Sequence, residues 1–229
     1  MGSGQTKYKY TETIQSGVYG SVIKVERKNK NYIAKITCEN DIELSIYKLI
    51  DENKLKKFVT LKEYGEDMSM DDVKEITTHQ DILSLFEIME CDRYNVLIIE
   101  QVIPLDEYPL DSLDDKTANK MIYDMYEGVM EALSIGVVPS DLKTDNVGID
   151  ENGRIKYFDL GMYSLKKKKK MDKIKHSKIM DILDYKADLF DQLRKYDIFS
   201  DAIHYLEQIS DDDESGTNVL DMFMTEFLD

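Results

Sequence analysis

The most informative stretch of this chain reads Pro139-Ser-Asp-Leu-Lys-Thr-Asp-Asn146, and it is followed by Phe158-Asp-Leu-Gly161. Transfer of a phosphoryl group from a metal-bound nucleotide requires a carboxylate near the attacking hydroxyl, oxygen ligands for Mg²⁺ and a cation near the moving phosphate. Four side chains in these two stretches supply all three: Asp141, Lys143, Asn146 and Asp159. We therefore expect phosphoryl-transfer chemistry at this loop. An ordinary turn rich in Asp and Asn is the alternative interpretation.

The bulk composition limits the possible classes of protein. The chain has 229 residues, 42% of them hydrophobic, and a formal net charge of -16. This is enough for one domain or two closely joined lobes. The negative charge argues against specific nucleic-acid binding, because phosphates would be repelled. No apolar run approaches about 18–20 residues, so we expect no membrane span.

The two cysteines, Cys38 and Cys91, are too few for a disulfide framework. We therefore expect reduced thiols and a cytoplasmic location, where glutathione keeps thiols reduced. Nothing in the composition indicates an oligomeric state.

Hydrophobic periodicity divides the chain into a strand-rich half and a helical half, which predicts an α+β fold. Expected strands cover 8–14, 21–26, 31–37, 58–64 and 94–102, with a helix at 39–51 and a polar insertion at 67–91 whose end, 80–89, is a helix candidate. Expected helices cover 117–134, 174–195 and 199–209. Asn152-Gly153 predicts a hairpin turn between strands at 147–149 and 155–158.

Two glycines, Gly17 and Gly20, lie between the first two expected strands. Without a Cβ they would let the backbone approach phosphates closely, although a plain hairpin has the same pattern. Lys35 lies in an apolar strand, where an ammonium is costly unless it meets an anion or reaches solvent from an edge. Glu43 is the natural protein partner, and Glu39 is a rival.

Taken together, these motifs resemble those of protein kinases between about residues 8 and 162. The matching positions are Gly17, Gly20, Val22, Lys35, Glu43, Glu100, Val102, Asp141, Lys143, Asn146 and Asp159. The segment that begins at Glu43 is especially similar to casein kinases and vaccinia-related kinases. The resemblance implies a two-lobed protein-kinase-like fold, with an antiparallel-sheet N-lobe and hinge over 8–102 and a reduced, helical C-lobe over 103–229.

The resemblance also implies roles for the catalytic-loop residues. Asp141 would accept or orient the proton of the substrate hydroxyl. Lys143 would stabilise charge on the transferred phosphoryl group. Asn146 and Asp159 would hold Mg²⁺, a hard ion that prefers oxygen ligands.

On the nucleotide side, the resemblance implies that Lys35, fixed by Glu43, grips the α- and β-phosphates of ATP. The backbone of Glu100 and Val102 would hydrogen-bond adenine, and Val22 would pack over its ring. Gly17 and Gly20 would cover the phosphates.

The chain departs from the kinase pattern at several positions. Gln15 replaces the first glycine of the loop, Ile33 stands where alanine is usual, and Leu160 replaces phenylalanine. Pro139-Ser140 replaces His-Arg, so switching through an arginine that binds a phosphorylated activation loop is unavailable. Residues 162–229 contain no Ala-Pro-Glu motif. Reduced kinases of this sort resemble some viral and bacterial-effector kinases, which act in the host-cell cytoplasm.

Charge is unevenly distributed in this last part of the chain. Residues 166–178 contain eight lysines, whereas 197–229 contain ten acids and no lysine or arginine. Two solvated segments of opposite sign are the simpler interpretation, and an anion-binding patch is the functional one.

Three functional hypotheses follow. The first is a minimal kinase, lacking a standard activation segment, that uses ATP and Mg²⁺ to phosphorylate Ser or Thr of a protein substrate, such as a host protein. The second is a pseudokinase that binds a host kinase or its partner. The third is a kinase acting on a small molecule.

Overall fold

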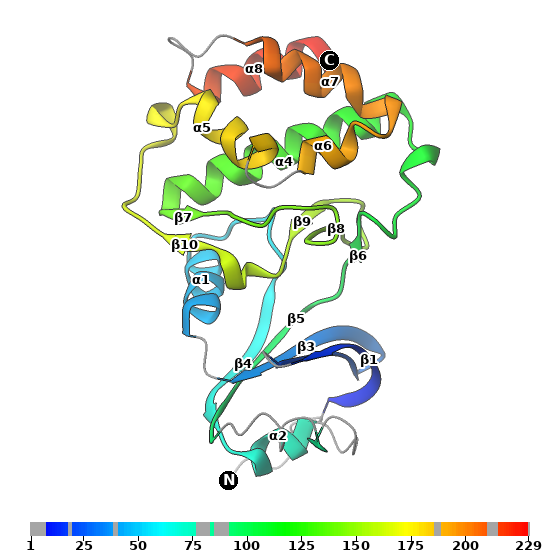
Figure 1. Ribbon diagram of the computed structural model, residues 1–229, viewed down its shortest axis with the longest axis vertical. Coiled ribbons are helices and arrows are strands. Elements are labelled where there is room, and N and C mark those ends of the chain that lie inside the picture. Colours follow the sequence, from blue (N-terminus) through cyan, green and yellow to red (C-terminus); the bar gives the residue numbers. More distant parts are fainter. Residues whose placement is uncertain are drawn as a thin grey trace. The chain divides into compact units, whose positions relative to one another are not determined.

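The computed structural model describes residues 8–17, 20–38, 41–76, 83–84, 92–185, 189–209 and 215–228. Its internal contacts define two compact units. We call Met1–Ser45 with Thr60–Gln101 the sheet unit, and Ile46–Val59 with Val102–Asp229 the helical unit. The expected α+β class is confirmed, with an antiparallel sheet in one unit and mainly helices in the other (Figure 1). The lobe boundaries at 8–102 and 103–229 stay predictions.

The sheet unit is built on five antiparallel strands in the order β1-β2-β3-β5-β4. Their bounds are β1 Lys9–Gly17, β2 Gly20–Arg27, β3 Lys30–Cys38, β4 Leu61–Met68 and β5 Tyr94–Glu100. All five strands were expected, with small shifts at their ends. Successive side chains of a strand point to opposite faces, so each strand contributes alternate residues to the core.

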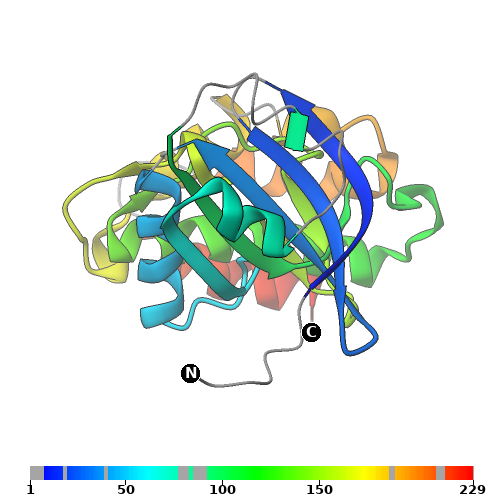
Figure 2. The ribbon, with the colours of Figure 1, turned by 90° about the horizontal axis from the view of Figure 1, so that it is seen from below.

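One face of this sheet carries a hydrophobic core. Its fully buried members are Ile23, Val25, Ala34, Ile36, Val73, Tyr94, Val96 and Ile98. Helix α2 (Met70–Ile76), which contributes Val73, lies over this face (Figure 2). The sequence pattern predicts only a polar insertion there. Ser69 and Asp72 cap the helix start reciprocally, at 2.8 Å and 3.3 Å, as in a capping box. The helix candidate at 80–89 lies largely outside the described residues.

Helix α1 (Asp41–Glu52) follows β3 and corresponds to the helix expected at 39–51. Glu39 lies outside the described residues. Cys38, at the end of β3, is disulfide-bonded, contrary to the expectation of free thiols, and Cys91 also lies outside the described residues. Among the helices that the structure describes, none is long and apolar enough to cross a membrane.

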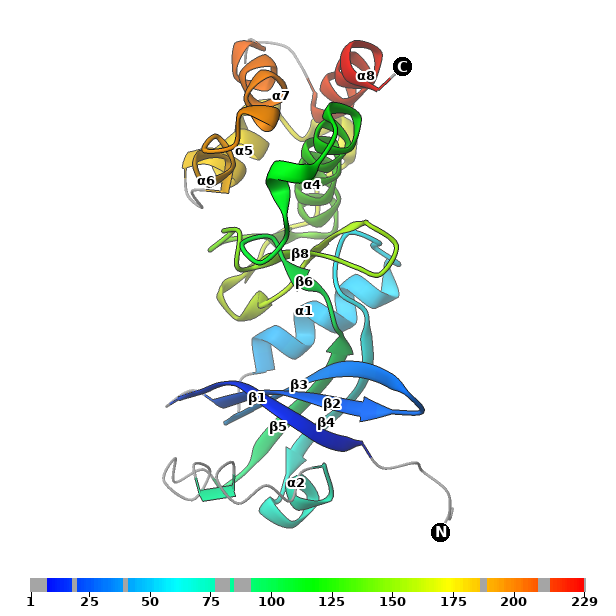
Figure 3. The same cartoon turned by 90° about the vertical axis from the view of Figure 1, so that its right-hand side faces the viewer.

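The helical unit is organised around α4 (Asp115–Ile135), which was expected at 117–134 (Figure 3). Asp114 caps its start by accepting a hydrogen bond from the Thr117 amide at 2.7 Å. Gly136 ends it at φ 87°, the left-handed conformation that favours glycine. A Cβ on Gly136 would also lie 2.2 Å from the carbonyl oxygen of Lys166, so glycine is required twice over.

Three further helices pack against α4: α5 (His176–Met180), α7 (Asp197–Gln208) and α8 (Gly216–Phe227). A buried hydrogen-bond chain joins the first two to it. Tyr126 donates its hydroxyl to His176 Nδ1 at 2.7 Å, and His176 Nε2 donates to the Leu206 carbonyl at 2.8 Å. The Leu206 carbonyl can only accept, so Nε2 carries a proton, and in the neutral tautomer Nδ1 accepts from Tyr126.

The helix expected at 174–195 is interrupted in the structure. The described part of this range contains α5, the π-helical turn η4 Asp181–Tyr185 and α6 Leu189–Leu193, and the 3₁₀ turn η3 Met171–Lys173 precedes it. Helix α8 was not among the predicted helices. It packs Phe223 and Phe227 against each other with centroids 4.7 Å apart, and Tyr205 of α7 meets both rings edge-on.

The remaining strands of the helical unit are short and position the candidate site. β6 Ile103–Pro104 and β9 Ile155–Tyr157 flank β8 Val147–Ile149, and β7 Val137–Val138 pairs with β10 Ser164–Leu165. The expected hairpin is confirmed between β8 and β9, with Gly153 in its turn at φ 75°. The single turns η1 Leu110–Ser112 and η2 Leu160–Met162 complete the unit.

Candidate active site

The loop between β7 and β8 holds Asp141 and Asn146 in direct contact. Asn146 is 6% exposed, and its amide Nδ2 donates to the Asp141 backbone oxygen at 2.8 Å and to Asp141 Oδ2 at 3.0 Å. These two bonds orient the amide and leave its oxygen Oδ1 available as a ligand. The loop also closes on itself, because the Asn146 backbone amide donates to the Lys143 carbonyl at 2.9 Å.

Asp141 and Asp159 both adopt left-handed backbone conformations, at φ 56° and φ 54°. Among non-glycine residues Asp and Asn tolerate this region best, and such positions concentrate at functional sites. Both carboxylates raise the pKa of the Tyr163 phenol, which burial raises first and most. Asp141 and Asp159 therefore act on the same buried hydroxyl, which places them in one neighbourhood of the helical unit.

Lys143 lies between two carboxylates of the same loop. Its Nζ is 3.4 Å from Asp145 Oδ2 and 3.6 Å from Asp141 Oδ2. Partial burial lowers the pKa of the Lys143 ammonium, but Asp145 and Asp141 outweigh it, so the net shift is upward. Lys143 is therefore a stable cation beside Asp141 throughout the physiological pH range.

Residues distant in sequence hold this loop in place. Gln192 of α6 accepts at Oε1 from both the amide and the hydroxyl of Thr144, at 2.9 and 2.8 Å. The Leu105 amide donates to the Thr144 and Val147 carbonyls, both at 2.9 Å. Hydrogen bonds from α6 and from the segment after β6 therefore hold the loop. Sequence reasoning did not single out Gln192 or Leu105, since neither has a motif and both act only through the tertiary fold.

In the sheet unit, Lys35 and Glu43 form an ion pair. Lys35 Nζ lies 3.0 Å from Glu43 Oε1 and 2.9 Å from Oε2. The Glu43 side chain is only 3% exposed and that of Lys35 20%, so the pair is largely desolvated. A buried carboxylate needs such a partner. The contact gives Glu43 the pairing position, and the role of Lys35 toward a nucleotide stays a prediction.

The glycine-rich turn lies on the same sheet. Gly17 pairs with Gly20 across β1 and β2, and residues 18–19 lie outside the described residues. At Gly20, φ is 145° and a Cβ would stand 2.3 Å from the carbonyl oxygen of Ile36. Close packing on β3 thus already requires this glycine. Val22 pairs with Lys35 in the ladder, and directly opposed residues share a face of the sheet.

The two predicted adenine-binding residues fall in different units. Glu100 ends β5 in the sheet unit, where its amide donates to the Thr60 carbonyl at 3.1 Å and its carboxylate accepts from the Thr60 hydroxyl at 2.9 Å. Val102 belongs to the helical unit and lies beside Gly148 of β8. Their role toward adenine stays a prediction.

The oxygen donors of Asn146 and Asp159 suit a hard divalent ion. They do not form a metal cage made entirely of protein side chains, since the described residues contain no group of three or more His, Cys, Asp and Glu that could hold a metal ion. An amide oxygen from Asn146 and a carboxylate from Asp159 are the sparse oxygen ligands typical of Mg²⁺, which completes its shell with water and phosphate oxygens. These two residues fit the predicted ion, and its binding stays a prediction.

The lysine run follows directly after the candidate site. Lys166–Lys170 are all exposed, as a solvated segment would be. The segment is anchored at its start, because the Lys166 amide donates to the Gly136 carbonyl at 2.7 Å and the Ser140 hydroxyl donates to the Met162 carbonyl. The run therefore begins next to the end of α4 and the start of the candidate loop 139–146.

Comparisons with known proteins give one consistent answer, although no protein-family profile matches the chain. The chain is 25% identical over 175 residues to CBL-interacting protein kinase 31 of Oryza sativa subsp. japonica, which covers 75% of this chain and 36% of that protein. It is 24% identical to NUAK family SNF1-like kinase 1 of Mus musculus, covering 72% and 23%. It is 26% identical to serine/threonine-protein kinase SSN3 of Phaeosphaeria nodorum, covering 69% and 35%. The chain thus spans about a third or less of the length of these relatives.

Among solved structures, the kinase PK-1 of the Cydia pomonella granulovirus matches with a TM-score of 0.49 and 17% identity, over 69% of this chain and 53% of that one. The kinase relatives match more than two thirds of the chain, and its elements follow the expected order of an antiparallel sheet and then helices. The chain is thus similar to protein kinases over more than two thirds of its length.

Proposed function

We propose that this protein transfers the γ-phosphoryl group of ATP, bound with Mg²⁺, to the hydroxyl of a Ser or Thr residue in a protein substrate. The observation that carries the proposal is the contact between Asn146 and Asp141, with Lys143 beside the same carboxylate. The serine/threonine-protein kinase relative supports the acceptor type.

In the proposed reaction, Asp141 accepts the proton of the attacking hydroxyl as its oxygen forms a bond to the γ-phosphorus. The bond from that phosphorus to the β–γ bridging oxygen breaks, and ADP leaves. Lys143 stabilises the charge on the phosphoryl oxygens during transfer. Bound Mg²⁺ would neutralise phosphate charge, and Asn146 and Asp159 are the residues that would hold it.

Residues of the sheet unit would bind the nucleotide. Lys35 would hold the α- and β-phosphates, and its ion pair with Glu43 fixes the direction of the ammonium. Val22, on the same face as Lys35, would pack over the adenine ring, and the backbone of Glu100 and Val102 would hydrogen-bond its edge. The turn closed by Gly17 and Gly20 would lie over the phosphates.

Incubation of the full chain with γ-labelled ATP, Mg²⁺ and a panel of protein substrates tests the proposal. Labelled phosphoserine or phosphothreonine should appear, and Asp141→Ala should reduce its formation about 10²–10⁴-fold, the usual contribution of a positioned base. Asp145→Ala is the matched control, since Asp145 lies on the same loop with similar exposure and also contacts Lys143.

The two competing hypotheses predict different results. A pseudokinase would give no label with any substrate, while its binding to a host kinase or partner would persist in Asp141→Ala. A small-molecule kinase would label a metabolite in an extract and no protein. Thermal unfolding separates binding from transfer, because a ligand selective for the folded state must raise the melting temperature.

A further inference from the structure

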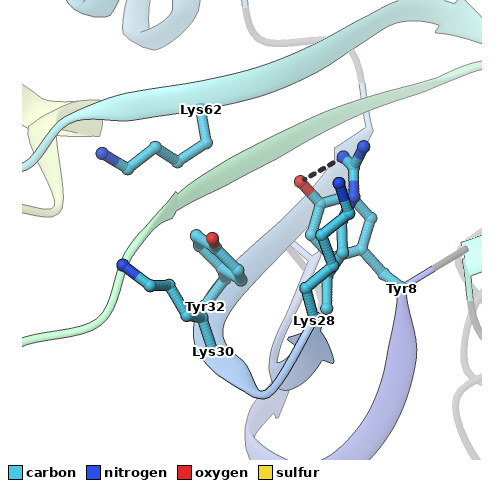
Figure 4. A pocket seen from close by; sticks show the side chains of 6 residues that line it. Tyr8, Lys28, Lys30, Tyr32 and Lys62 are labelled. Atoms are coloured by element: carbon cyan, nitrogen blue, oxygen red, sulfur yellow. Dashed lines mark hydrogen bonds between the residues drawn. The ribbon is translucent and has the colours of Figure 1, made fainter. Parts of the chain in front are cut away.

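The sheet unit contains a second concave site, distinct from the Lys35–Glu43 pair. A cavity of about 330 Å³ is lined by Tyr8, Arg27, Lys28, Lys30, Tyr32 and Lys62 (Figure 4). Its size is at the lower end of the range for small-ligand pockets. Four of the six lining residues are cations, in a chain whose net charge is -16. A binding site for an anion would explain why cations gather around one cavity of a strongly acidic chain.

Strand alternation places this cavity away from the residues proposed to bind the nucleotide. Tyr32 packs against the hydrophobic core together with Ala34 and Ile36, on one face of β3. Lys35 has the opposite parity along the same strand, so its side chain leaves from the other face. A ligand in the cavity would therefore not occupy the position proposed for ATP.

Part of the cavity wall is held in a fixed arrangement. The Arg27 guanidinium stacks over the Tyr8 ring at 5.0 Å, donates to the Tyr8 hydroxyl at 3.2 Å and pairs with Glu63 at 2.9 Å. The Tyr8 and Tyr32 rings meet edge-on, with centroids 5.8 Å apart. These contacts fix Arg27 and both phenols before any ligand arrives, which lowers the entropy cost of binding.

The lysines of the cavity retain unneutralised charge. Within the described part of the chain, no carboxylate forms an ion pair with Lys28 or Lys30. Among the described residues, the ion pair of Lys62 is a long one, 3.8 Å from Nζ to Glu100 Oε2. Glu63 neutralises Arg27, so the excess positive charge of the cavity comes from its lysines. A ligand with more than one negative charge would match it.

The backbone that presents Lys28 is unusual. Lys28 and Asn29 form the two-residue turn between β2 and β3, at φ 54° and φ 59°. Such turns favour Asn, Asp and Gly, and a lysine in the left-handed region is uncommon. The turn fixes the position from which the Lys28 side chain reaches the cavity.

From this cavity we propose a binding site for a phosphomonoester dianion, either free or carried on a phosphorylated side chain. Such a group has a charge of about -1.5 to -2 at pH 7 and three strong acceptor oxygens. Lys28, Lys30 and Lys62 would meet its charge, and the Tyr32 hydroxyl would donate to an oxygen. A lone carboxylate has half the charge and fewer acceptors. The site is independent of the proposed transfer reaction.

Calorimetric titration of the full chain tests the proposal with three probes: inorganic phosphate, a short phosphoserine peptide and its unphosphorylated form. The test variant combines Lys28→Gly with Lys30→Gln. Glycine suits the left-handed position, so the turn should be retained. Lys54→Gly is the matched control, because Lys54 is also an exposed lysine, at φ 58°, but lies outside the cavity.

A second control separates this site from the nucleotide site. Lys35→Met combined with Glu43→Gln removes that ion pair as a unit and leaves no buried carboxylate unpaired. Phosphate and the phosphopeptide should bind to the wild type, to Lys54→Gly and to this double variant. Binding should weaken about tenfold in Lys28→Gly with Lys30→Gln, as loss of two exposed charge contacts suggests.

The outcomes divide clearly. Binding of phosphate and phosphopeptide with equal affinity supports recognition of the free group, and tighter peptide binding supports a phosphorylated side chain. The proposal is overturned if neither probe binds, if the unphosphorylated peptide binds equally well, or if the Lys28 and Lys30 substitutions have no effect. Loss of binding in the Lys35 and Glu43 variant would assign the phosphate to the nucleotide site.

Discussion

Asn146 Nδ2 donates at the same time to the backbone oxygen and to the carboxylate of Asp141, at 2.8 and 3.0 Å. This arrangement makes the proposed base and the proposed metal ligand one structural unit. Displacement of either residue changes the position of the other, so their contributions to turnover should not be additive.

Asn146→Ala should therefore strongly reduce turnover and also misplace Asp141. We expect a loss of about 10²–10⁴-fold, similar to that of Asp141→Ala, and a much smaller loss than the product of the two in the double variant. The measurement is labelled phosphate transfer across a Mg²⁺ titration. Asn152→Ala, in the exposed β8–β9 turn, is the control. Full additivity would show that the two residues act separately.

Removing Lys35 together with its partner should weaken nucleotide binding. Lys35→Met with Glu43→Gln is the appropriate variant, because Lys35→Met by itself would break a buried ion pair of the 3% exposed Glu43 carboxylate, which costs about 3–5 kcal/mol. Loss of a charge-assisted contact predicts roughly 10–100-fold weaker ATP binding. Lys24→Met, on the neighbouring strand β2, should bind ATP as the wild type does. Unchanged ATP affinity in the Lys35 variant would remove this residue from the nucleotide site.

Gly136→Ala should destabilise the protein more than Gly153→Ala does. Both glycines have positive φ, at 87° and 75°, which costs an alanine about 1–2 kcal/mol. Only at Gly136 would the new Cβ also meet backbone, since nothing lies within 4 Å of a Cβ at Gly153. Chemical denaturation of both variants measures the difference. Equal losses would show that the segment at Lys166 moves aside freely.

Glu131→Gln should stabilise the protein at neutral pH. Burial first, and then the nearby Glu127 carboxylate, raises the pKa of Glu131, and its Oε2 is buried without a hydrogen bond within the described residues. A carboxyl whose pKa is raised on folding binds more protons in the folded state, so its folded form loses stability as the pH rises through that pKa.

The advantage of Glu131→Gln should accordingly be largest at pH 7 and should shrink as the pH falls toward the ordinary carboxyl range. Denaturation curves of both proteins measure this difference. They should run from about pH 4, near the ordinary carboxyl pKa, to about pH 8. Glu127→Gln should not show this gain, because Glu127 pairs with Lys57 at 2.9 Å. A gain independent of pH would assign the effect to helix propensity instead.

Local sequence pattern was sufficient for the elements whose stability arises within the segment itself. The periodicity of α4, its Asp114 cap and its terminal Gly136 are all local signals. The strands of the sheet unit likewise show in the sequence as short runs of β-branched and aromatic residues. The order and spacing of Gly17, Lys35, Asp141 and Asp159 could also be read directly, because a motif is defined by positions along the sequence.

Contacts between distant segments could not be predicted in this way. Among the side chains of α2 whose burial is described, Val73 is buried, and its packing on the sheet stabilises a helix in a polar sequence. The expected helix at 174–195 is broken at η4, where the buried side chains of Ile182 and Leu183 pack at a π-helical turn. The disulfide at Cys38 was contrary to the expectation from composition.

What the sequence by itself determined is the identity and order of the chemical groups: a lysine in a strand, an acid on a helix, and an acid, a lysine and an amide on one loop. Only the tertiary structure decided which of them touch. It buried Glu43 against Lys35, turned the Asn146 amide onto Asp141 and gathered Arg27, Lys28, Lys30 and Lys62 around one cavity. The physical reason is that covalent order fixes spacing along the chain, whereas desolvation and ion pairing depend on distances that exist only after distant segments have packed together.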